Sequence, residues 1–368
     1  MGTDTDMTDM STNHFPACYV ELPHETEGRR AAFYLAAEEY IAETLPADSY
    51  FMTWQLGPTV VMGRNQAIGQ EVDLDFCHRE GIDVIRRRSG GGAIFADERN
   101  IMTSLITEAE AVEPLFREYA EAVASALRQL GAPAVVAGRN DIILSPSPPT
   151  PNGRGEERGE KVPPIRGRDL GREAKVCGNA FYHRKDRCIA HGTMLYDTDA
   201  RRMERALHPD VSKLEAKGVK SVRSRVGVLK DYLPFGVGTL RKRLRELLCD
   251  RTVLLTAEDV ACIEQLEQRY YDPSYLYGST TQADTIRKGR IEGCGTVELW
   301  FSVRDNIISD VHLRGDFFDL GQASACFRKA FIGVPLTPDD LRQAIREHQP
   351  ERSIRGLCQE ALMRLLLT

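Results

Sequence analysis

The residues best suited to chemistry form the run 86–92, in which three arginines and a serine precede three glycines. Glycine loses backbone entropy in a strand and packs no side chain, so a glycine run between two β-favouring segments must serve another purpose. Bare backbone lets main-chain N–H groups approach an anion, and the arginine and serine side chains can complete a phosphate cradle. We therefore predict a phosphate-binding loop here. The alternative is a glycine-rich hairpin turn with surface arginines.

Two charged residues further along the chain could act on a bound nucleotide. Lys175 begins the run KVCGNA at 175–180, and its charge could offset the negative charge that develops when a carboxylate attacks a phosphate. Its alternative is a solvated charge at the end of a strand. Asp141 ends the run GRND at 138–141, where its carboxylate could hold a magnesium ion on the nucleotide or bind a nucleotide hydroxyl. Its alternative is an Asx-type turn.

A histidine and two cysteines are weaker candidates. His191 precedes Gly192 and Thr193 in a strand-like run, and it is expected to be a hydrogen-bonded structural residue or to shape a substrate pocket. A thiolate at Cys177 or Cys188 would indicate acyl-thioester chemistry. Free cysteines, however, are usually buried as small hydrophobic residues.

Composition excludes several classes of protein. The chain has 368 residues and a net charge of −6, which argues against a protein that binds nucleic acid through a broad cationic surface. Its nine cysteines are odd in number and include no C-x-x-C pair, so we expect neither a zinc site nor a disulfide framework. The sequence has no run of about 18 apolar residues, so we predict no membrane-spanning helix. The polar residues 1–16 predict a disordered leader, and we expect a cytoplasmic protein.

The elements that must position these residues follow from periodicity and turn signals. Apolar residues at three- and four-residue spacing predict a core-facing helix over 29–45 and another over 114–130 that ends before Gly131. Alternating β-favouring runs predict strands at 50–56, 59–62, 82–88, 93–96, 101–107, 134–137 and 141–144. A hairpin is predicted from 175–183 and 187–196 about the turn 184–186.

Between the strand at 141–144 and that hairpin, residues 145–174 contain 11 prolines and glycines among 30 residues. Such a segment cannot bury enough apolar surface to offset its ordering entropy, so we predict a disordered insertion. Helices are predicted at 199–207, 212–217, 238–248 and 257–270, followed by a polar linker at 278–293.

The end of the chain predicts a second domain. A hairpin of 296–303 and 307–313 turns at 304–306, and three helical patterns follow, the last over 356–367. That is enough for an α+β unit of about 80 residues. We therefore predict an α+β protein: a large domain of mixed β-sheets flanked by helices at 17–278, and a small accessory domain at 285–368.

Five motifs in order carry a resemblance to a known family: RRRSGGGAIF at 86–95, GRND at 138–141, KVCGNA at 175–180, HGTML at 191–195 and KGVKSVRSR at 217–225. Together they resemble the lipoate–protein ligase A family, within the wider group of biotin ligases and octanoyltransferases. The likeness extends from the first helix to about Leu233 and continues more weakly in the C-terminal domain.

The resemblance implies an enzyme that uses ATP and Mg²⁺ to convert lipoate to lipoyl-AMP. It then transfers the lipoyl group to a lysine of a lipoyl domain, in the acyltransferase subunits of 2-oxoacid dehydrogenases or the glycine-cleavage H protein. Lys175 would be the catalytic residue and would contact both substrates. The resemblance also implies ATP binding by Arg87 and by the backbone of Gly92, Ala93, Ile94 and Phe95. We further predict that Asp141 binds ATP and contacts the metal, and that Ser89, Gly91 and His191 bind lipoate.

Two departures from the family pattern limit the transfer. Ala96 stands before Asp97 where many relatives have a histidine, and Arg99 stands where a glycine is common. The insertion at 145–174 is long for the family and suggests a lid over the adenylate. Two alternatives stay open: an ATP-independent octanoyltransferase that uses Cys177 or Cys188, and a regulator that binds lipoate or a nucleotide without turnover.

Overall fold

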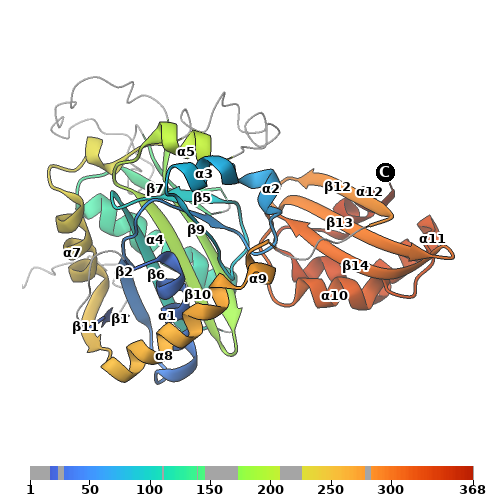
Figure 1. The fold of residues 1–368 in the computed structure, drawn as a ribbon, viewed down its shortest axis with the longest axis horizontal. Helices are drawn as coiled ribbons and strands as arrows, with labels where there is room; N and C mark the ends of the chain where they lie inside the picture. The colour runs from blue at the N-terminus through green and yellow to red at the C-terminus, as the bar shows by residue number, and fades with distance from the viewer. Residues whose placement is uncertain are drawn as a thin grey trace, which may run out of the picture.

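The computed structural model of the chain describes residues 17–23, 29–109, 112–138, 140–145, 173–207, 226–277 and 283–367. The predicted leader, nearly all of the predicted insertion and the motif at 217–225 lie outside the described residues. A large mixed sheet with helices on both faces is joined to a smaller C-terminal unit of one sheet and helices (Figure 1). The predicted α+β architecture is therefore confirmed.

The large sheet has eight strands in the order β11-β1-β2-β6-β10-β9-β8-β7. Its first three strands run parallel to one another, and the remaining pairs are antiparallel. In sheet order the strands are β11 (Cys249–Leu254), β1 (Ala17–Glu21), β2 (Tyr50–Trp54), β6 (Asn100–Glu108), β10 (Arg187–Leu195), β9 (Ala174–Arg184), β8 (Asp141–Leu144) and β7 (Ala134–Ala137).

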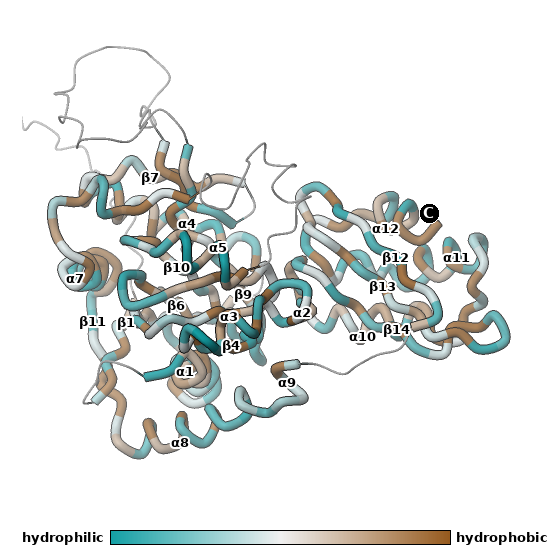
Figure 2. Tube along the Cα trace, turned by 45° about the horizontal axis from the view of Figure 1, so that its top comes forward, coloured by the Kyte–Doolittle hydropathy of each residue, from teal (hydrophilic) through white to brown (hydrophobic). Residues whose placement is uncertain are grey.

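Helices cover both faces of this sheet. The predicted first helix is α1 (Ala31–Thr44), whose small and aromatic residues are buried against one face. The opposite face is covered by α4 (Val112–Gln129) and α7 (Val237–Leu248). Figure 2 shows α4 and α1 on opposite sides of β6 and β10. Because successive side chains of a strand point to opposite faces, each central strand contributes alternate residues to two separate cores.

A three-stranded sheet carries the glycine-rich segment. Its order is β4-β3-β5, where β3 (Thr59–Met62) pairs parallel with β4 (Asp83–Arg86) and antiparallel with β5 (Ile94–Ala96). Residues 87–93 therefore cross the end of β3 and join two strands that do not pair with each other. The alternative prediction that residues 86–92 form a hairpin turn is wrong, because a hairpin would join two strands that pair with each other. Short helices α2 (Ile68–Glu71), α3 (Leu74–Arg79) and α5 (Ala200–Ala206) lie beside this sheet.

The C-terminal unit is an antiparallel sheet of β12 (Thr285–Ile291), β13 (Gly295–Arg304) and β14 (Ile307–Gly315). The helices α10 (Ala323–Phe331), α11 (Pro338–His348) and α12 (Gln359–Leu367) share its core. The predicted β13–β14 hairpin is confirmed, with Asp305 and Asn306 at φ of 51° and 61° in its turn. The predicted linker at 278–293 is wrong over β12, because this polar edge strand is held by backbone pairing with β13.

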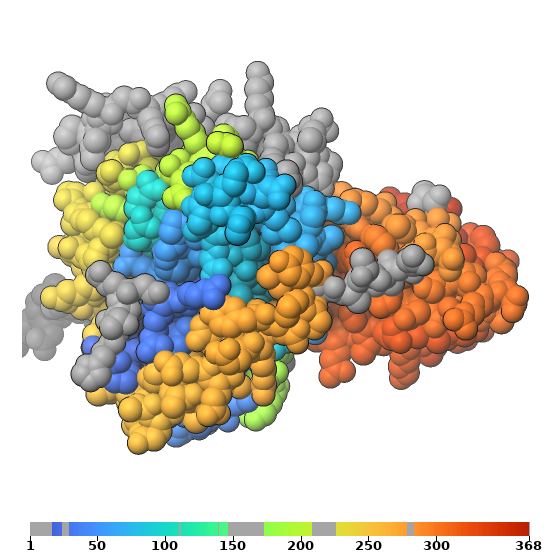
Figure 3. Space-filling model, in the orientation of Figure 1, coloured from blue at the N-terminus to red at the C-terminus, as the bar shows by residue number. Residues whose placement is uncertain are grey.

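Two helices connect the units. The predicted helix at 257–270 is α8 (Ala257–Glu267), continued by a 3₁₀ turn over Gln268–Tyr271, and α9 (Pro273–Tyr277) follows. In Figure 3 the C-terminal unit adjoins the larger unit around α2 and α9. Among the helices of the described residues, none combines the length and the apolar character that crossing a membrane requires.

The C-terminal unit also packs against the larger unit through Phe317 and Phe318. The carbonyl oxygen of Phe317 accepts a hydrogen bond from the Gly91 N–H at 3.2 Å. Phe318 is fully buried, and its ring stacks on Phe181 of β9 with a centroid distance of 5.1 Å. Arg355 extends this contact with an ion pair to Glu113 of α4 at 2.6 Å. The glycine-rich segment therefore lies against both units.

Candidate active site

The glycine-rich segment is organised around the side chain of Arg87. Its guanidinium donates from Nη1 to the Val61 carbonyl at 3.0 Å, and from Nη2 to the carbonyls of Gly90 at 2.7 Å and Gly92 at 2.9 Å. Its Nε donates to Ser89 Oγ at 2.8 Å. Arg87 thus ties both ends of the glycine run to β3. In this arrangement the guanidinium faces the protein backbone, and ATP binding by Arg87 stays a prediction.

The charge of Arg87 shapes the electrostatics of the segment. The residue is 6% exposed, and burial lowers its pKa to about 10, so the guanidinium is still protonated at neutral pH. Its hydrogen-bond partners in the described part of the chain are neutral oxygens. A buried cation held by neutral groups creates a positive potential around the segment, which favours an anion bound beside it.

Arg86 and Arg88 hold the segment to the rest of the fold and are not the surface arginines of the hairpin-turn alternative. Arg86 is 5% exposed and donates from Nη1 to the carbonyls of Gly63, Arg64 and Gln66 at 3.1, 2.9 and 2.7 Å. Arg88 donates to Glu39 Oε1 at 3.2 Å and lies over the ring of Tyr275. The three arginines therefore fasten the segment to three different parts of the fold.

The segment reaches the large sheet through Ser89 and His191. Ser89 Oγ lies 2.7 Å from His191 Nε2, and both residues are buried. The other ring nitrogen, Nδ1, lies 3.0 Å from both carboxylate oxygens of Glu38 on α1. A buried hydrogen-bonded chain thus runs from α1 through β10 to the glycine-rich segment. The sequence predicted a hydrogen-bonded His191 but not these partners.

Lys175 and Asp141 lie on neighbouring strands and form an ion pair. The Nζ of Lys175 on β9 is 2.6 Å from Oδ1 of Asp141 on β8. An added Cβ at Gly178 would lie 2.6 Å from this Nζ, so the glycine of the KVCGNA run leaves space for the lysine side chain. The side chain of Lys175 is 20% exposed. The alternative of a solvated strand-end lysine is therefore wrong.

The lysine and the glycine-rich segment share one face of the large sheet. Gly178, beneath the Lys175 amine, pairs with Thr193 of β10, and His191 lies two residues away on that strand. Alternate residues of a strand point to the same face, so the Lys175 amine and the His191–Ser89 contact lie on the same side. The sequence motifs that are far apart in the chain are thus brought to one region.

Cys177 and Cys188 point to the other face. Both are fully buried in the core that contains α4. Burial raises the pKa of each thiol to about 12, so neither forms a thiolate near neutral pH. The Sγ of Cys177 donates to Asn179 Oδ1 at 3.2 Å. The structure therefore gives both cysteines the packing role.

The remaining predicted residues lie along the segment and β5. The Gly91 N–H is bonded to Phe317, Ile94 pairs with Val61, and the Phe95 side chain is buried beneath the small sheet. Only the backbone of Phe95 can therefore contact a nucleotide. An added Cβ at Gly92 would meet no atom within 4 Å, so this position borders open space. Gly92 and Ala93 are thus the best-placed backbone positions for a ligand.

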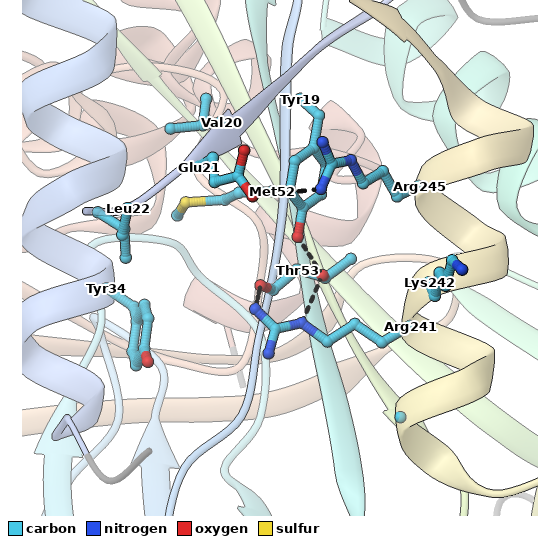
Figure 4. A pocket seen from close by; sticks show the side chains of 11 residues that line it. Tyr19, Val20, Glu21, Leu22, Tyr34, Met52, Thr53, Arg241, Lys242 and Arg245 are labelled. Carbon is cyan, nitrogen blue, oxygen red and sulfur yellow. Dashed lines mark hydrogen bonds and ion pairs between the residues drawn. The ribbon is translucent and has the colours of Figure 1, made fainter. Parts of the chain in front are cut away.

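The structure has one cavity that borders this region and another that lies apart from it. One of about 650 Å³ lies between the two units, where Arg64 and Arg86 face Trp300, His312 and Arg314. Another of about 220 Å³ lies between α1 and α7, where Arg241 donates to the Thr53 carbonyl at 2.8 Å (Figure 4). No residue predicted from sequence as a site residue lines the second cavity. Over the described ranges, no cluster of three or more His, Cys, Asp or Glu could hold a metal.

Sequence reasoning missed two parts of this region. Glu38 is fully buried in a helix of mostly apolar residues, and a charged residue within such a helix was the signal that could have found it. The Phe317–Phe318 contact gave no such signal, because two phenylalanines after a strand look like ordinary core residues.

Comparison with known proteins gives matches over most of the chain. The family model described as the lipoyl protein ligase A/B catalytic domain matches residues 30–248. The model described as the bacterial lipoate protein ligase C-terminus matches residues 280–366. Lipoate–protein ligase 1 of Staphylococcus aureus is 29% identical over 341 residues, 90% of this chain and 95% of the relative. The lipoate-protein ligase LplJ of Bacillus subtilis is 31% identical, over 79% and 83% of the two chains.

Solved structures give the same fold. The crystal structure of P. falciparum LipL1 with lipoate superposes with a TM-score of 0.68 at 16% identity, covering 95% of this chain and 99% of that one. A lipoate-protein ligase A bound with ATP has a TM-score of 0.53 at 21% identity, covering 72% and 99%. At these identities the likeness shows the fold.

Proposed function

The chain belongs to the lipoyl protein ligase A/B family, and from this we propose that it is an ATP-dependent lipoate–protein ligase. In the proposed reaction, lipoate and ATP give lipoyl-AMP and pyrophosphate, and the lipoyl group then passes to a lysine of a lipoyl domain. Relatives that cover most of this chain are named lipoate–protein ligases, and structures with its fold bind lipoate or ATP.

The observation that carries the proposal is the shared face of Lys175 and the glycine-rich segment. The Lys175 amine lies on this face, and the segment that reaches it through the Ser89–His191 contact carries a buried guanidinium at Arg87 and open backbone at Gly92. Adenylation places new negative charge on a phosphate and a carboxylate, so fixed cations and N–H groups lower its barrier. No enzyme nucleophile is required for this step.

The proposed reaction has two steps, and Lys175 acts in the first. The carboxylate of lipoate attacks the α-phosphorus, and the bond to pyrophosphate breaks while Lys175 offsets the charge. The amine of the acceptor lysine then attacks the acyl carbon, AMP leaves, and the amine loses a proton. Before substrates bind, Asp141 holds the Lys175 amine. Keeping water from the mixed anhydride prevents its hydrolysis between the two steps.

We include Mg²⁺ in the proposed reaction, and we expect the protein to supply few of its ligands. Mg²⁺ on a nucleotide commonly takes one or two carboxylates, with phosphate and water oxygens completing the shell. Asp141 would supply one carboxylate beside Lys175. A bound Mg²⁺ would neutralise phosphate charge and fix its orientation.

The acceptors and the cellular location are also proposals. We propose lipoyl domains of 2-oxoacid dehydrogenase acyltransferase subunits and the glycine-cleavage H protein as acceptors, on the strength of the family assignment. A cytoplasmic location agrees with nine cysteines that are all free.

Two assays test the proposed function. Lipoate should stimulate ATP–pyrophosphate exchange, and a purified lipoyl domain should gain the mass of one lipoyl group only when ATP is present. Chelation of divalent cations should stop both reactions. Parallel reactions with octanoate and with octanoyl acyl carrier protein separate the alternatives. Acylation from the carrier protein without ATP would identify an octanoyltransferase, and binding without exchange or mass gain would identify a regulator.

The alternative that uses a cysteine makes its own prediction. The double variant Cys177→Ala, Cys188→Ala is expected to keep lipoate-dependent exchange within about twofold of the parent, because both thiols lie in the α4 core and stay protonated. Exchange rate and melting temperature are measured together. A loss above tenfold in a variant that melts like the parent would favour the cysteine mechanism.

A further inference from the structure

Glu38 lies at the centre of a buried polar chain, in contact with two hydrogen-bond donors. It is fully buried on α1, where Ser104 Oγ donates to its Oε1 at 2.6 Å and His191 Nδ1 lies 3.0 Å from both oxygens. Trp54 Nε1 in turn donates to Ser104 Oγ at 3.0 Å. A buried carboxylate is costly unless its oxygens are hydrogen-bonded, and here both are. This series of hydrogen bonds reaches Ser89 of the glycine-rich segment.

The Glu38 carboxylate sets the direction of the hydrogen bonds that are made to it. An ionised carboxylate only accepts, so His191 Nδ1 carries a hydrogen and donates it to Glu38. The other ring nitrogen, Nε2, lies 2.7 Å from Ser89 Oγ. Ser89 Oγ also accepts a hydrogen bond from Arg87 Nε, so this oxygen is held between the two side chains. Glu38 thereby determines how Ser89 is held, although the two residues do not touch.

We infer that Glu38 is a positioning residue of the proposed adenylation site, acting through His191 to fix Ser89 and the backbone that follows it. The inference rests on the proposed function for its kinetic consequences. Ser89 is fully buried between Arg87 and His191, so it anchors the segment in this structure. With Ser89 fixed, the N–H groups of Gly92 and Ala93 are held where a phosphate would bind.

A glutamine at position 38 keeps the volume and changes only the polarity. Its amide nitrogen cannot accept a hydrogen bond, so one position now occupied by a carboxylate oxygen becomes a donor facing His191 Nδ1 or Ser104. Facing Nδ1, this N–H group opposes the ring N–H and leaves His191 one acceptor where it had two. The ring is then less firmly oriented, and its contact with Ser89 Oγ is weakened. Facing Ser104, it disturbs the donor that orients Glu38.

The test uses Glu38→Gln, Ser89→Ala and their combination, in the full chain. Glu298→Gln is the matched control, because Glu298 is also a buried acid, 5% exposed and paired with Lys288, in the C-terminal sheet. The first measurement is amide hydrogen exchange of peptides covering 87–95. The second is the KM for lipoate and for ATP in pyrophosphate exchange. Melting temperatures are recorded for all variants.

We expect Glu38→Gln to speed hydrogen exchange at 90–95 and to raise the KM of at least one substrate about tenfold, as loss of one charge-assisted hydrogen bond predicts. The control should match the parent in both measurements. Because Glu38 and Ser89 act through one chain of contacts, the double variant should lose less than the product of the two single effects.

Two results would overturn the inference: parent-like exchange at 87–95 in Glu38→Gln, or single effects that multiply in the double variant. If Glu38→Gln does not fold, His191→Gln breaks the same link, and the same outcomes decide. A parent chain without lipoate-dependent exchange would refute the proposed function instead. Hydrogen exchange at 87–95 would then still decide whether Glu38 holds the segment.

Discussion

Replacing Lys175 with alanine is expected to lower lipoate-dependent pyrophosphate exchange by a factor of about 10²–10³, the usual effect of removing one preorganised group that stabilises developing charge. The amine lies over Gly178 on the face shared with the glycine-rich segment, and substrate phosphate would displace its partner Asp141. The loss should appear mainly in kcat, because the charge that Lys175 offsets is greatest in the transition state.

Lys185→Ala is the control for this prediction. Lys185 is an exposed lysine in the turn between β9 and β10, and Lys175 lies near the opposite end of β9. Its removal should leave exchange and melting temperature unchanged. Single-turnover transfer from added lipoyl-AMP to a lipoyl domain would show whether the second step also needs Lys175. Full exchange activity in Lys175→Ala would refute its proposed catalytic role.

Gly90→Ala should destabilise the protein by about 1–3 kcal/mol, the usual cost of overpacking a filled site. An added Cβ would overlap the carbonyl oxygen of Phe317 and lie 3.1 Å from the Phe318 Cα. These are backbone atoms, so relief requires the C-terminal unit or the segment to shift. Exchange activity should fall as well, because Gly90 also supplies a carbonyl to Arg87.

Gly92→Ala provides the matched comparison two residues away. No atom lies within 4 Å of a Cβ added there, so this variant should unfold at the same denaturant concentration as the parent. Chemical denaturation of both variants measures the difference. Equal stabilities for the two variants would show that the contact with Phe317 does not constrain the segment.

Much of the fold followed from the sequence because its elements have strong local signals. The strands at 59–62, 134–137 and 141–144 were predicted with the observed bounds, since Gly, Pro or polar turn residues flank short β-favouring runs. The parallel strands β1 and β11 were not predicted. β11 reads CDRTVL, a polar run whose strand character comes from pairing with β1.

The sequence predicted which residues form the candidate site, but it did not predict the contacts between them. A glycine run next to arginines and a lysine at the start of a small-residue run can be recognised in the sequence by their residue types. The segment at 86–92 and Lys175 could therefore be identified. The contact between Ser89 and His191 joins residues 102 positions apart, and no local pattern encodes it. The structural role of Arg86 had no local signal for the same reason: its acceptors are carbonyls of 63–66 and of Leu276, which the fold brings to it.

The position of Phe318 bears on how the protein can be divided. This residue follows the C-terminal sheet in sequence, yet it belongs to the apolar core of the larger unit and stacks on Phe181. A fragment that stops before the C-terminal sheet would leave Phe181 without this cover, and newly exposed apolar surface promotes aggregation. Truncations intended to isolate a catalytic fragment should therefore retain Phe318 or be co-expressed with the C-terminal part as a second chain.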